Sequence, residues 1–408
     1  PLLEEVEDVL ELPGAVQPQR IRLGQGHHAG VPAIGFWGDS HLAAAFFTDE
    51  MLVSLGLGKD EVKPGLLPPT MGRAGVRLPL RKHCKSPGWR FVNAYAARGE
   101  VQKVGPALTV LENTKEDAAL WIDFRYPDTR PALSQLTVLF REIDDQPVLL
   151  EIEVDDNPAK QLTLEKGESQ LQLSAALLQA QVQAFSQLKL RVLQGTLALE
   201  GFAPVYVAPA RLRLDLFGIP GATARSWKVA DPGYLRSRLS APDYDLVILE
   251  YGTNEGADRN FDPESYQSGL AASLRGLKTS FPDAQCLLIG PTDRGVLVKK
   301  AARADPRKKH AGKAAHASPR RAVASRGELL KFAKIHARIA EIQKNLAQAN
   351  GCGFWDWQLA MGGPGGAYKW FFHAPAWMAR DLIHLTRGGY QESARLFVAD
   401  TGIGDWLK

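Results

Sequence analysis

The sequence predicts an α/β fold with a parallel sheet, interrupted by an inserted antiparallel β-sandwich. Two observations lead to this prediction. Apolar strand-like runs alternate with helix-like runs on both sides of a central block, and within that block short runs alternate apolar with polar residues. Strand and helix alternation favours a parallel sheet, whereas many short alternating runs favour a sandwich. We therefore expect an α/β segment over 1–100, the sandwich over 101–207 and a second α/β segment over 208–408.

The first α/β segment contains a strand, a tight turn and a helix in succession. The apolar run Ala33–Trp37 leads into Gly38-Asp39-Ser40, and a helix-like run follows with Leu42, Phe46 and Leu52 on one side. This order places a serine hydroxyl at the carboxyl edge of a sheet, beside the N–H groups that begin a helix. An isolated Gly-Asp-Ser is more often a simple helix cap, so the role of Ser40 depends on residues far downstream.

The central block has the pattern of half-buried strands. Apolar residues recur at every second position, and polar turns such as 155–158 and 165–168 separate the runs, which include 136–140, 152–154, 162–164, 171–173, 188–192 and 197–199. About a hundred residues suffice for one domain of this kind. The block contains no His and no Cys, so we expect no catalytic cluster within it.

The α/β pattern returns after the block. Strand-like runs occupy 212–217, 245–251, 286–290 and 353–357. Apolar residues at spacings of three and four predict helices around 266–277 and 332–346. A glycine-rich loop at 361–366 precedes a final helix that begins near Gly388.

Composition describes an ordinary globular protein with one unusual segment. The 408 residues are 45% hydrophobic and 23% charged, and no apolar run reaches the length of a membrane span. Ten Lys or Arg against one acid between Lys299 and Arg326 give that segment +9, so the remainder carries 4 − 9 = −5. This distribution does not describe a uniformly basic nucleic-acid-binding surface. We expect the basic segment to be a solvated loop, with a docking patch for an anionic polymer as the alternative.

Cysteine and histidine spacing predicts neither a metal site nor a cofactor. Cys84, Cys286 and Cys352 form no metal-ligand spacing and no disulfide framework, and the last two are expected to be buried thiols. The pair His27-His28 has no third ligand at a suitable spacing. The chain begins with Pro1 rather than Met, which is compatible with removal of an N-terminal signal.

Three loops carry the polar groups that acyl transfer requires. Ser40 follows the first strand, Asn254 follows the apolar run ending at Tyr251, and Asp381 stands three residues before His384. A serine nucleophile needs a base within hydrogen-bond reach, and the base needs an acceptor that fixes its tautomer. His384 and Asp381 have the right chemistry for these two roles. The N–H groups of Ser40 and Gly221 and the Asn254 amide are candidate donors to an oxyanion.

These segments resemble the SGNH (GDSL-type) hydrolase superfamily, and most closely the bacterial peptidoglycan O-acetylesterases. The resemblance covers most of residues 33–400. It is carried by Gly38-Asp39-Ser40-His41, the turn 218–222, Gly252-Thr253-Asn254-Glu255 and Asp381-x-x-His384-Leu385, with further matches at 75–81, 290–294, 354–357 and 361–363. It implies a three-layer α/β/α domain and an insert similar to a carbohydrate-binding jelly roll.

The resemblance also implies roles for individual residues. Ser40 would be the nucleophile and Asp381 and His384 its partners, while Ser40, Gly221 and Asn254 would form the oxyanion hole. The sequence departs from the family pattern in the long basic segment after Arg294 and in Pro220, which lacks an N–H. Because of Pro220, Gly218 stays open as the donor in place of Gly221.

Three functions are compatible with this sequence. The leading hypothesis is a serine esterase that removes O-acetyl groups from a cell-wall glycan, in particular O-acetylated N-acetylmuramic acid of peptidoglycan, in the periplasm or cell envelope of a bacterium. A polysaccharide O-acetyltransferase would use the same triad with a sugar as acceptor. A glycan-binding scaffold would use the sandwich and exposed aromatic residues such as Trp121. None of the three calls for a metal, a cofactor, a nucleic acid or a transmembrane segment.

Overall fold

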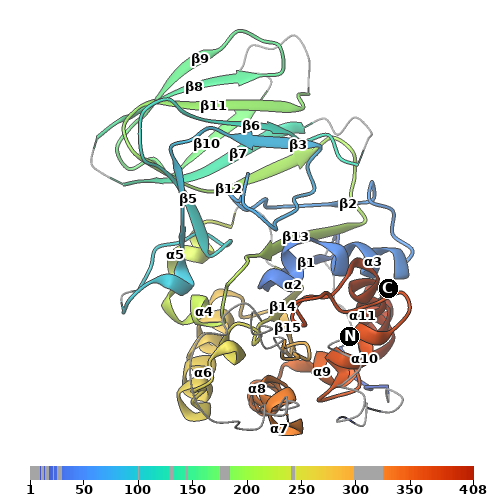
Figure 1. Cartoon of the computed structure of the whole chain (residues 1–408). Helices are drawn as coiled ribbons and strands as arrows, with labels where there is room; N and C mark the ends of the chain where they lie inside the picture. Colours follow the sequence, from blue (N-terminus) through green and yellow to red (C-terminus); the bar gives the residue numbers. More distant parts are fainter. Residues whose placement is uncertain are drawn as a thin grey trace, which may run out of the picture.

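The computed structural model describes Leu10, Pro13, residues 18–21, 23–24 and 30–408, except 100, 128–132, 144–145, 175–183, 240–243 and 298–324. The pair His27-His28 and nearly all of the basic segment 299–326 lie outside the described residues. Within the described residues a helix-flanked sheet and two further sheets are arranged one above the other (Figure 1).

The first sheet has six strands, all parallel, in the order β16-β15-β14-β1-β13-β2. Its strands are β1 Ala33–Gly38, β2 Val62–Lys63, β13 Leu212–Gly218, β14 Leu246–Glu250, β15 Gln285–Ile289 and β16 Gly353–Trp355. β1 lies between β13 and β14, so Gly38 is opposite both Gly218 and Glu250. The three loops that follow these strands therefore begin at the same edge of the sheet, which confirms the predicted parallel α/β arrangement.

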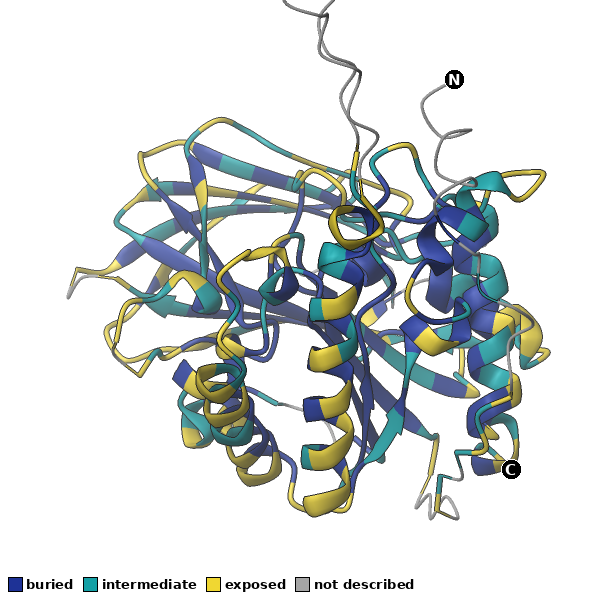
Figure 2. Cartoon of the chain, turned by 60° about the horizontal axis from the view of Figure 1, so that its bottom comes forward, coloured by how far each residue is buried: buried dark blue, intermediate teal, exposed yellow. Residues whose placement is uncertain are grey.

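Helices pack on both faces of this sheet. On one face, Phe47 and Met51 of α3 and Phe397 of α11 join Ile34 and Phe36 of β1 in one hydrophobic core. On the other face, Trp227 of α4 and Leu274 of α6 pack with Trp37 and Leu249. The long helices turn their exposed residues outward and their buried residues toward the interior (Figure 2). The helices are α2 Ser40–Ala43, α3 Phe46–Ser54, α4 Arg225–Val229, α5 Pro232–Ser237, α6 Pro263–Ser280, α7 Arg326–Leu329, α8 Lys331–Ala349, α9 Trp357–Ala360, α10 Gly366–Phe372, α11 Arg387–Thr401 and α12 Ile403–Trp406, with 3-10 turns η1 Ala94–Ala96 and η2 Glu255–Ala257.

Two antiparallel five-stranded sheets enclose a third hydrophobic core. One has the order β10-β7-β12-β5-β4, with β4 Trp89–Asn93, β5 Thr109–Asn113, β7 Leu133–Glu142, β10 Gln170–Ser174 and β12 Leu197–Tyr206. The other has the order β3-β6-β11-β8-β9, with β3 Lys82–Lys85, β6 Ala118–Asp123, β8 Val148–Val154, β9 Lys160–Leu164 and β11 Gln187–Gln194. Val148, Leu150, Ile152 and Val154 alternate with more exposed neighbours, as the period-two pattern predicts.

The two antiparallel sheets include strands from before residue 101. β3 pairs with β6, and β4 pairs with β5. Both strands fall within residues 1–100, which were expected to belong to the first α/β segment. In the structure, β3 and β4 instead belong to the sandwich, which therefore begins earlier in the sequence than the expected residue 101.

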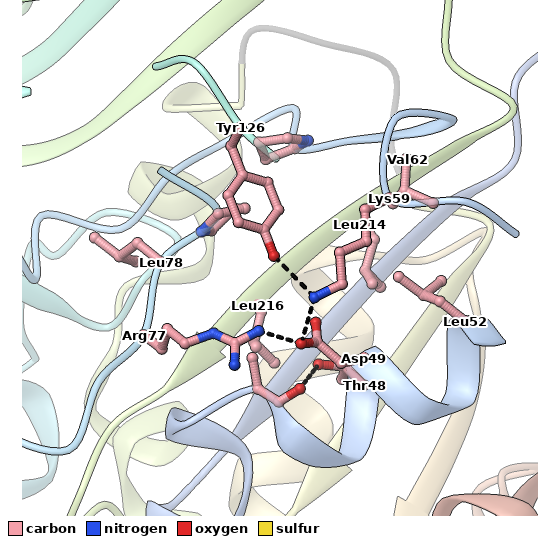
Figure 3. Close-up of a pocket in the computed structure, with 13 residues that line it drawn as sticks. Thr48, Asp49, Leu52, Lys59, Val62, Arg77, Leu78, Tyr126, Leu214 and Leu216 are labelled. Carbon is pink, nitrogen blue, oxygen red and sulfur yellow. Dashed lines mark hydrogen bonds and ion pairs between the residues drawn. The ribbon is translucent and has the colours of Figure 1, made fainter. Parts of the chain in front are cut away.

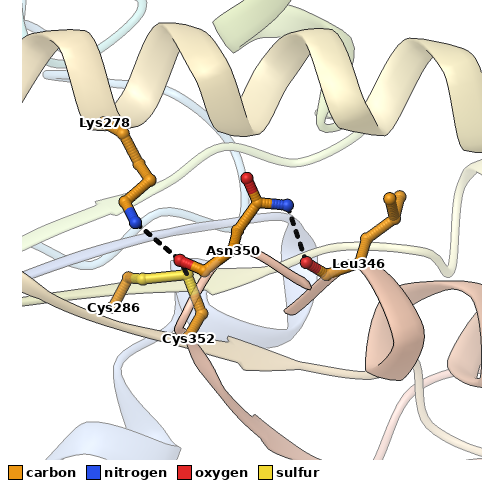
Figure 4. Close-up of a disulfide and its surroundings, with 5 residues drawn as sticks. All are labelled: Lys278, Cys286, Leu346, Asn350 and Cys352. Carbon is orange, nitrogen blue, oxygen red and sulfur yellow. Dashed lines mark hydrogen bonds between the residues drawn. A yellow bond between two sulfur atoms is a disulfide. The ribbon is translucent and has the colours of Figure 1, made fainter. Parts of the chain in front are cut away.

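Cys286 and Cys352 form a disulfide, so the expectation of two buried thiols is wrong. Cys286 lies in β15 and Cys352 directly precedes β16 (Figure 4). These two strands are neighbours in the parallel sheet, which brings together cysteines that are 66 residues apart in sequence. The spacing alone does not reveal the pair because it depends on strand order.

A cluster of charged residues connects the sandwich to the helix that follows Ser40. The Asp49 carboxylate of α3 accepts hydrogen bonds from Lys59 and Arg77, and Lys59 also donates to the hydroxyl of Tyr126, which follows β6, at 3.1 Å. These side chains line a small cavity whose apolar wall includes Leu52, Leu214 and Leu216 (Figure 3). Ser40, Asp381 and His384 do not line this cavity, so it is separate from the site described below.

Candidate active site

The Ser40 turn is held by glycine and carboxylate contacts. β1 ends at Gly38, and Asp39 caps α2 by accepting a 2.9 Å hydrogen bond from the His41 N–H. A Cβ on residue 38 would lie 2.6 Å from a Glu250 carboxyl oxygen, so glycine is required for this close approach. Ser40 is consequently the first residue of a helix at the carboxyl edge of the sheet, as the sequence predicts.

The structure brings Ser40, His384 and Asp381 together across more than three hundred residues. The Ser40 Oγ lies 3.0 Å from His384 Nε2, and His384 Nδ1 lies 2.7 Å from Asp381 Oδ2. With the proton on Nδ1, the imidazole donates to Asp381 and presents Nε2 as acceptor to the serine hydroxyl. Two-fifths of the His384 side chain is exposed, at 41%, so substrate can reach it.

The loop that carries Asp381 and His384 is fixed by its own backbone. Ala379 N–H donates to the His384 carbonyl at 2.8 Å, and Gly295 N–H donates to the Leu382 carbonyl at 2.9 Å. Buried Leu382 has φ +56°, a left-handed conformation that is rare for a branched side chain and is typical of functional loops. This backbone turns Asp381 back toward the ring of His384.

Asp381 is stabilised as a carboxylate. Its Oδ1 accepts the N–H groups of Ile383 and His384, each at 3.0 Å, while Oδ2 faces the imidazole. Burial raises the pKa of Asp381, but the hydrogen bonds from the His384 side chain and from both backbone N–H groups outweigh it and leave the pKa below its usual value. Asp381 is therefore charged at neutral pH.

His41 packs beside the His384 ring. Its Nδ1 lies 3.1 Å from the Tyr390 hydroxyl and its Nε2 lies 3.3 Å from Thr292 Oγ1, and its ring centroid is 5.4 Å from that of His384. Burial and the neighbouring His384 lower the pKa of His41 to about 3, so its imidazole stays neutral. The neutral His41 ring therefore packs beside His384 without adding a positive charge to the site.

Asn254 connects the Ser40 turn to the turn that contains Gly221. Its Nδ2 donates to the Ala222 carbonyl at 2.8 Å and to Asp39 Oδ2 at 3.2 Å. Gly221 is exposed and has φ +84°, a conformation that favours glycine. Gly218 lies within β13, where a Cβ would stand 2.5 Å from the Ala43 nitrogen, so it serves the close packing of α2.

Three carboxyl groups lie beneath the Ser40 turn. Burial raises the pKa of Asp39 to about 7 and that of Glu255 to about 7. Burial, and next the charge of Asp39, hold the pKa of Glu250 well above its usual value. Glu250 is therefore a neutral acid, and its Oε2 accepts a 3.1 Å hydrogen bond from the Asp39 N–H, which supports the backbone of the turn.

Replacing Glu250 with glutamine is expected to flatten the dependence of stability on pH. Folded Glu250 keeps a proton that the unfolded chain loses above about pH 4.5, so its stabilising contribution is present below that pH and is lost as pH rises toward the raised pKa. Glutamine cannot titrate but still offers an oxygen to the Asp39 N–H. Urea unfolding at pH 5 and pH 8 should show Glu250→Gln gaining stability relative to the native sequence as pH rises. Parallel pH profiles for both proteins would contradict the neutral state of Glu250.

No individual role was predicted for several residues that surround this site. His41 stands directly after the serine, and Glu250 is the charged residue that ends an otherwise apolar strand, so both had a local signal. Tyr390 had none, because its position beside His41 depends on how distant segments pack.

Part of the chain matches a known protein family. The model of the GDSL-like lipase/acylhydrolase family matches residues 193–392, which include Gly221, Asn254, Asp381 and His384 but not Ser40. The comparison with curated protein sequences found no significant match.

Solved structures provide a similar fold. One described as a peptidoglycan O-acetylesterase in action is 19% identical, with 91% of this chain and 90% of that chain covered and a TM-score of 0.61. A family two carbohydrate esterase from Cellvibrio japonicus is 14% identical over 79% of this chain and 100% of that chain, with a TM-score of 0.29. An acetylxylan esterase from Geobacillus stearothermophilus is 17% identical over 47% and 72%, with a TM-score of 0.30. Only the first score supports a common fold.

The family match, the parallel sheet and the serine, histidine and aspartate at its edge agree with one another. The chain thus contains, over residues 193–392, a domain of the GDSL-like lipase/acylhydrolase family.

Proposed function

We propose that this protein is a serine esterase that removes O-acetyl groups from a cell-wall glycan, specifically from O-acetylated N-acetylmuramic acid in peptidoglycan. The observation that carries the proposal is the continuous hydrogen-bonded chain from Ser40 Oγ through His384 to Asp381. Asn254 and Gly221 lie in the two loops beside it. Asp381, His384 and Ser40 are the catalytic residues of this proposal.

The first half of the reaction forms an acyl-enzyme. Ser40 Oγ attacks the acetyl carbonyl carbon while its proton moves to His384 Nε2, and Asp381 stabilises the imidazolium. The N–H groups of Ser40 and Gly221 and the Asn254 amide donate to the oxyanion. The carbon–oxygen bond to the sugar then breaks, and the His384 proton passes to the departing sugar oxygen.

The second half repeats these steps with water. His384 removes a proton from water, whose oxygen attacks the acetyl carbon on Ser40. Collapse of the oxyanion breaks the bond to Ser40 Oγ, which regains the proton from His384, and acetate leaves. A glycan hydroxyl in place of water would make the protein a transferase.

Acetate release from defined substrates tests this proposal. O-acetylated peptidoglycan, the same material after mild-base de-O-acetylation, acetylated xylan and a small aryl acetate would be compared, with Ser40→Ala as background. We expect acetate from O-acetylated peptidoglycan and from the aryl acetate only with Ser40 present. Faster release from acetylated xylan with none from peptidoglycan would contradict the substrate, and acetyl transfer to added glycan oligomers without acetate release would indicate a transferase.

The outward face of the sandwich offers a surface for a glycan chain. Trp121 of β6 is partly exposed there beside Lys189 and Arg191 of β11, and these two cations pair with Glu153 and Glu151 of β8. A hollow runs over these residues. Sugars stack their apolar faces on aromatic rings and donate hydroxyl groups to charged partners, so this sheet fits a carbohydrate-binding jelly roll.

Replacing Trp121 with alanine is expected to weaken binding to insoluble peptidoglycan while leaving kcat on the aryl acetate unchanged. Trp121 lies in a different sheet from the strand that leads to Ser40, so we expect it to act only on the polymer. Pull-down with purified sacculi and aryl acetate kinetics measure the two effects, with exposed Leu359→Ala as a control. Unchanged binding to sacculi would show that Trp121 does not contact the glycan.

A location in the periplasm or cell envelope follows from the proposed substrate. The Cys286–Cys352 disulfide supports it, because structural disulfides persist mainly in oxidising compartments. Among the described residues, no helix has the length and apolar character needed to cross a bilayer.

A further inference from the structure

The turn that contains Gly221 has one peptide group whose orientation decides whether the Gly221 N–H is presented. Ala222 N–H donates to the Ile219 carbonyl at 2.9 Å, Pro220 is the second residue and Gly221 the third, with φ +84°. These features define a type II β-turn. Type I and type II turns differ by a flip of the central peptide, here the one joining Pro220 to Gly221.

Two side chains from outside this turn hold its central carbonyl. Arg73 Nη2 donates to the Pro220 oxygen at 3.3 Å, and the Tyr95 hydroxyl donates to the same oxygen at 3.4 Å. The Pro220–Gly221 peptide is trans, so its carbonyl and its N–H point in opposite directions. By fixing the Pro220 carbonyl, Arg73 and Tyr95 direct the Gly221 N–H away from themselves.

The sandwich keeps Arg73 in place. Arg73 Nη1 donates to Asn93 Oδ1 of β4 at 2.7 Å, and Thr109 of β5 donates to the same oxygen at 2.9 Å. The Arg73 guanidinium also lies over the Phe91 ring of β4, 5.1 Å from its centroid. Tyr95 follows β4 directly, in η1, and its hydroxyl is 3.4 Å from where a Cβ on residue 221 would stand.

The opposite side of the turn is held from the parallel sheet. Asn254 donates to the Ala222 carbonyl at 2.8 Å, and Ala224 N–H donates to Glu255 at 2.9 Å. The central peptide, however, receives its side-chain hydrogen bonds from Arg73 and Tyr95. The sandwich therefore contacts the one peptide whose flip would withdraw a donor.

We propose that Arg73 and Tyr95 are positioning residues that keep the Gly221 N–H oriented as an oxyanion donor, so that the sandwich supports catalysis and not only glycan binding. The inference rests on the proposed function, in which Gly221 supplies that donor. Arg73 and Tyr95 act through the Pro220 carbonyl and contact no reacting atom. We expect them to stabilise the transition state more than the bound substrate, because the oxyanion that the Gly221 N–H contacts forms only in the transition state.

Kinetics on a small aryl acetate test this proposal, because that substrate has no glycan to bind. Tyr95→Phe keeps the ring and removes the hydroxyl, Arg73→Met removes the guanidinium, and the two are combined in a double variant. We expect kcat to fall about 3- to 10-fold for Tyr95→Phe and up to about 10²-fold for the double variant, which is at most the lower end of the 10²–10³ typical of a lost oxyanion donor. KM should change less than twofold.

A tetrahedral inhibitor provides a second measurement that a purely structural role would not affect. A small alkyl boronic acid forms an anionic adduct on a serine and should bind the double variant 10-fold or more weakly, while inhibition by acetate should be unchanged. Arg90→Met is the matched control, because Arg90 lies on β4, the strand that Arg73 contacts, but pairs with Glu112 and does not contact the turn. It should retain native kcat.

Two results would overturn the proposal. Loss of activity on O-acetylated peptidoglycan with native kcat on the aryl acetate would overturn the proposal and make Arg73 and Tyr95 glycan contacts. Native kcat and native boronate affinity in Tyr95→Phe and in the double variant would also overturn it, while Ser40→Ala shows independently whether the esterase assignment holds. If Arg73→Met fails to fold, Tyr95→Phe alone decides.

Discussion

Replacing His384 with alanine is expected to lower kcat on an aryl acetate by about 10⁴-fold or more, with the fold unchanged. Removal of a triad histidine has an effect of this size because the serine loses its only base and the leaving group its proton donor. Here the base is 3.0 Å from Ser40 Oγ and 2.7 Å from Asp381, so no neighbouring group can replace it without rearrangement. Neutral His41 is held by Tyr390 and Thr292 and is not free to do so.

Steady-state kinetics with a matched histidine variant measure this effect. His83→Ala removes an imidazole from β3 of the sandwich, where it accepts a hydrogen bond from Gly72 N–H, and should retain native kcat. Circular dichroism and thermal unfolding establish that both variants are folded. If His384→Ala kept a tenth or more of the native kcat, the imidazole would not be the base.

Replacing Asn254 with alanine is expected to lower kcat by about 10²–10³-fold with little change in KM. Its Nδ2 is a candidate oxyanion donor, and the loss of one such donor has this typical effect. The same group also joins the Ala222 carbonyl to Asp39, so the substitution loosens both turns beside Ser40. In the transition state we expect the longer bond, that to Asp39 at 3.2 Å, to be exchanged for the oxyanion.

The split between kcat and KM distinguishes this role from substrate binding. Asn260→Ala, in an exposed loop after the same strand, is the control and should behave as the native protein. A large rise in KM for Asn254→Ala with unchanged kcat would make Asn254 a binding residue and leave the oxyanion to the backbone N–H groups.

The sequence was sufficient for the parts of the fold that have a local signal. The apolar run before Gly38, the spacing of Leu270, Leu274 and Leu277, and the alternation in 148–154 each predict an element that the structure contains. The order of motifs also predicted that Ser40, Asn254 and His384 follow strands or precede a helix at one edge of a sheet. Parallel strands share that edge, so their loops converge.

What the sequence could not predict depends on which distant elements are neighbours. The Cys286–Cys352 disulfide follows from the pairing of β15 with β16, and the assignment of β3 and β4 to the sandwich follows from pairing with β6 and β5. The contact of Arg73 with Pro220 joins two loops that are 147 residues apart in the sequence. No periodicity or local motif contains this information.

Covalent labelling of the active serine tests the central claim most directly. The native protein would be reacted with an alkyl fluorophosphonate, its intact mass measured, and the modified peptide sequenced by mass spectrometry. The account predicts a single adduct on Ser40, loss of aryl acetate turnover in proportion to labelling, and neither labelling nor turnover in Ser40→Ala. An adduct on another residue, or turnover that persists in Ser40→Ala, would contradict it.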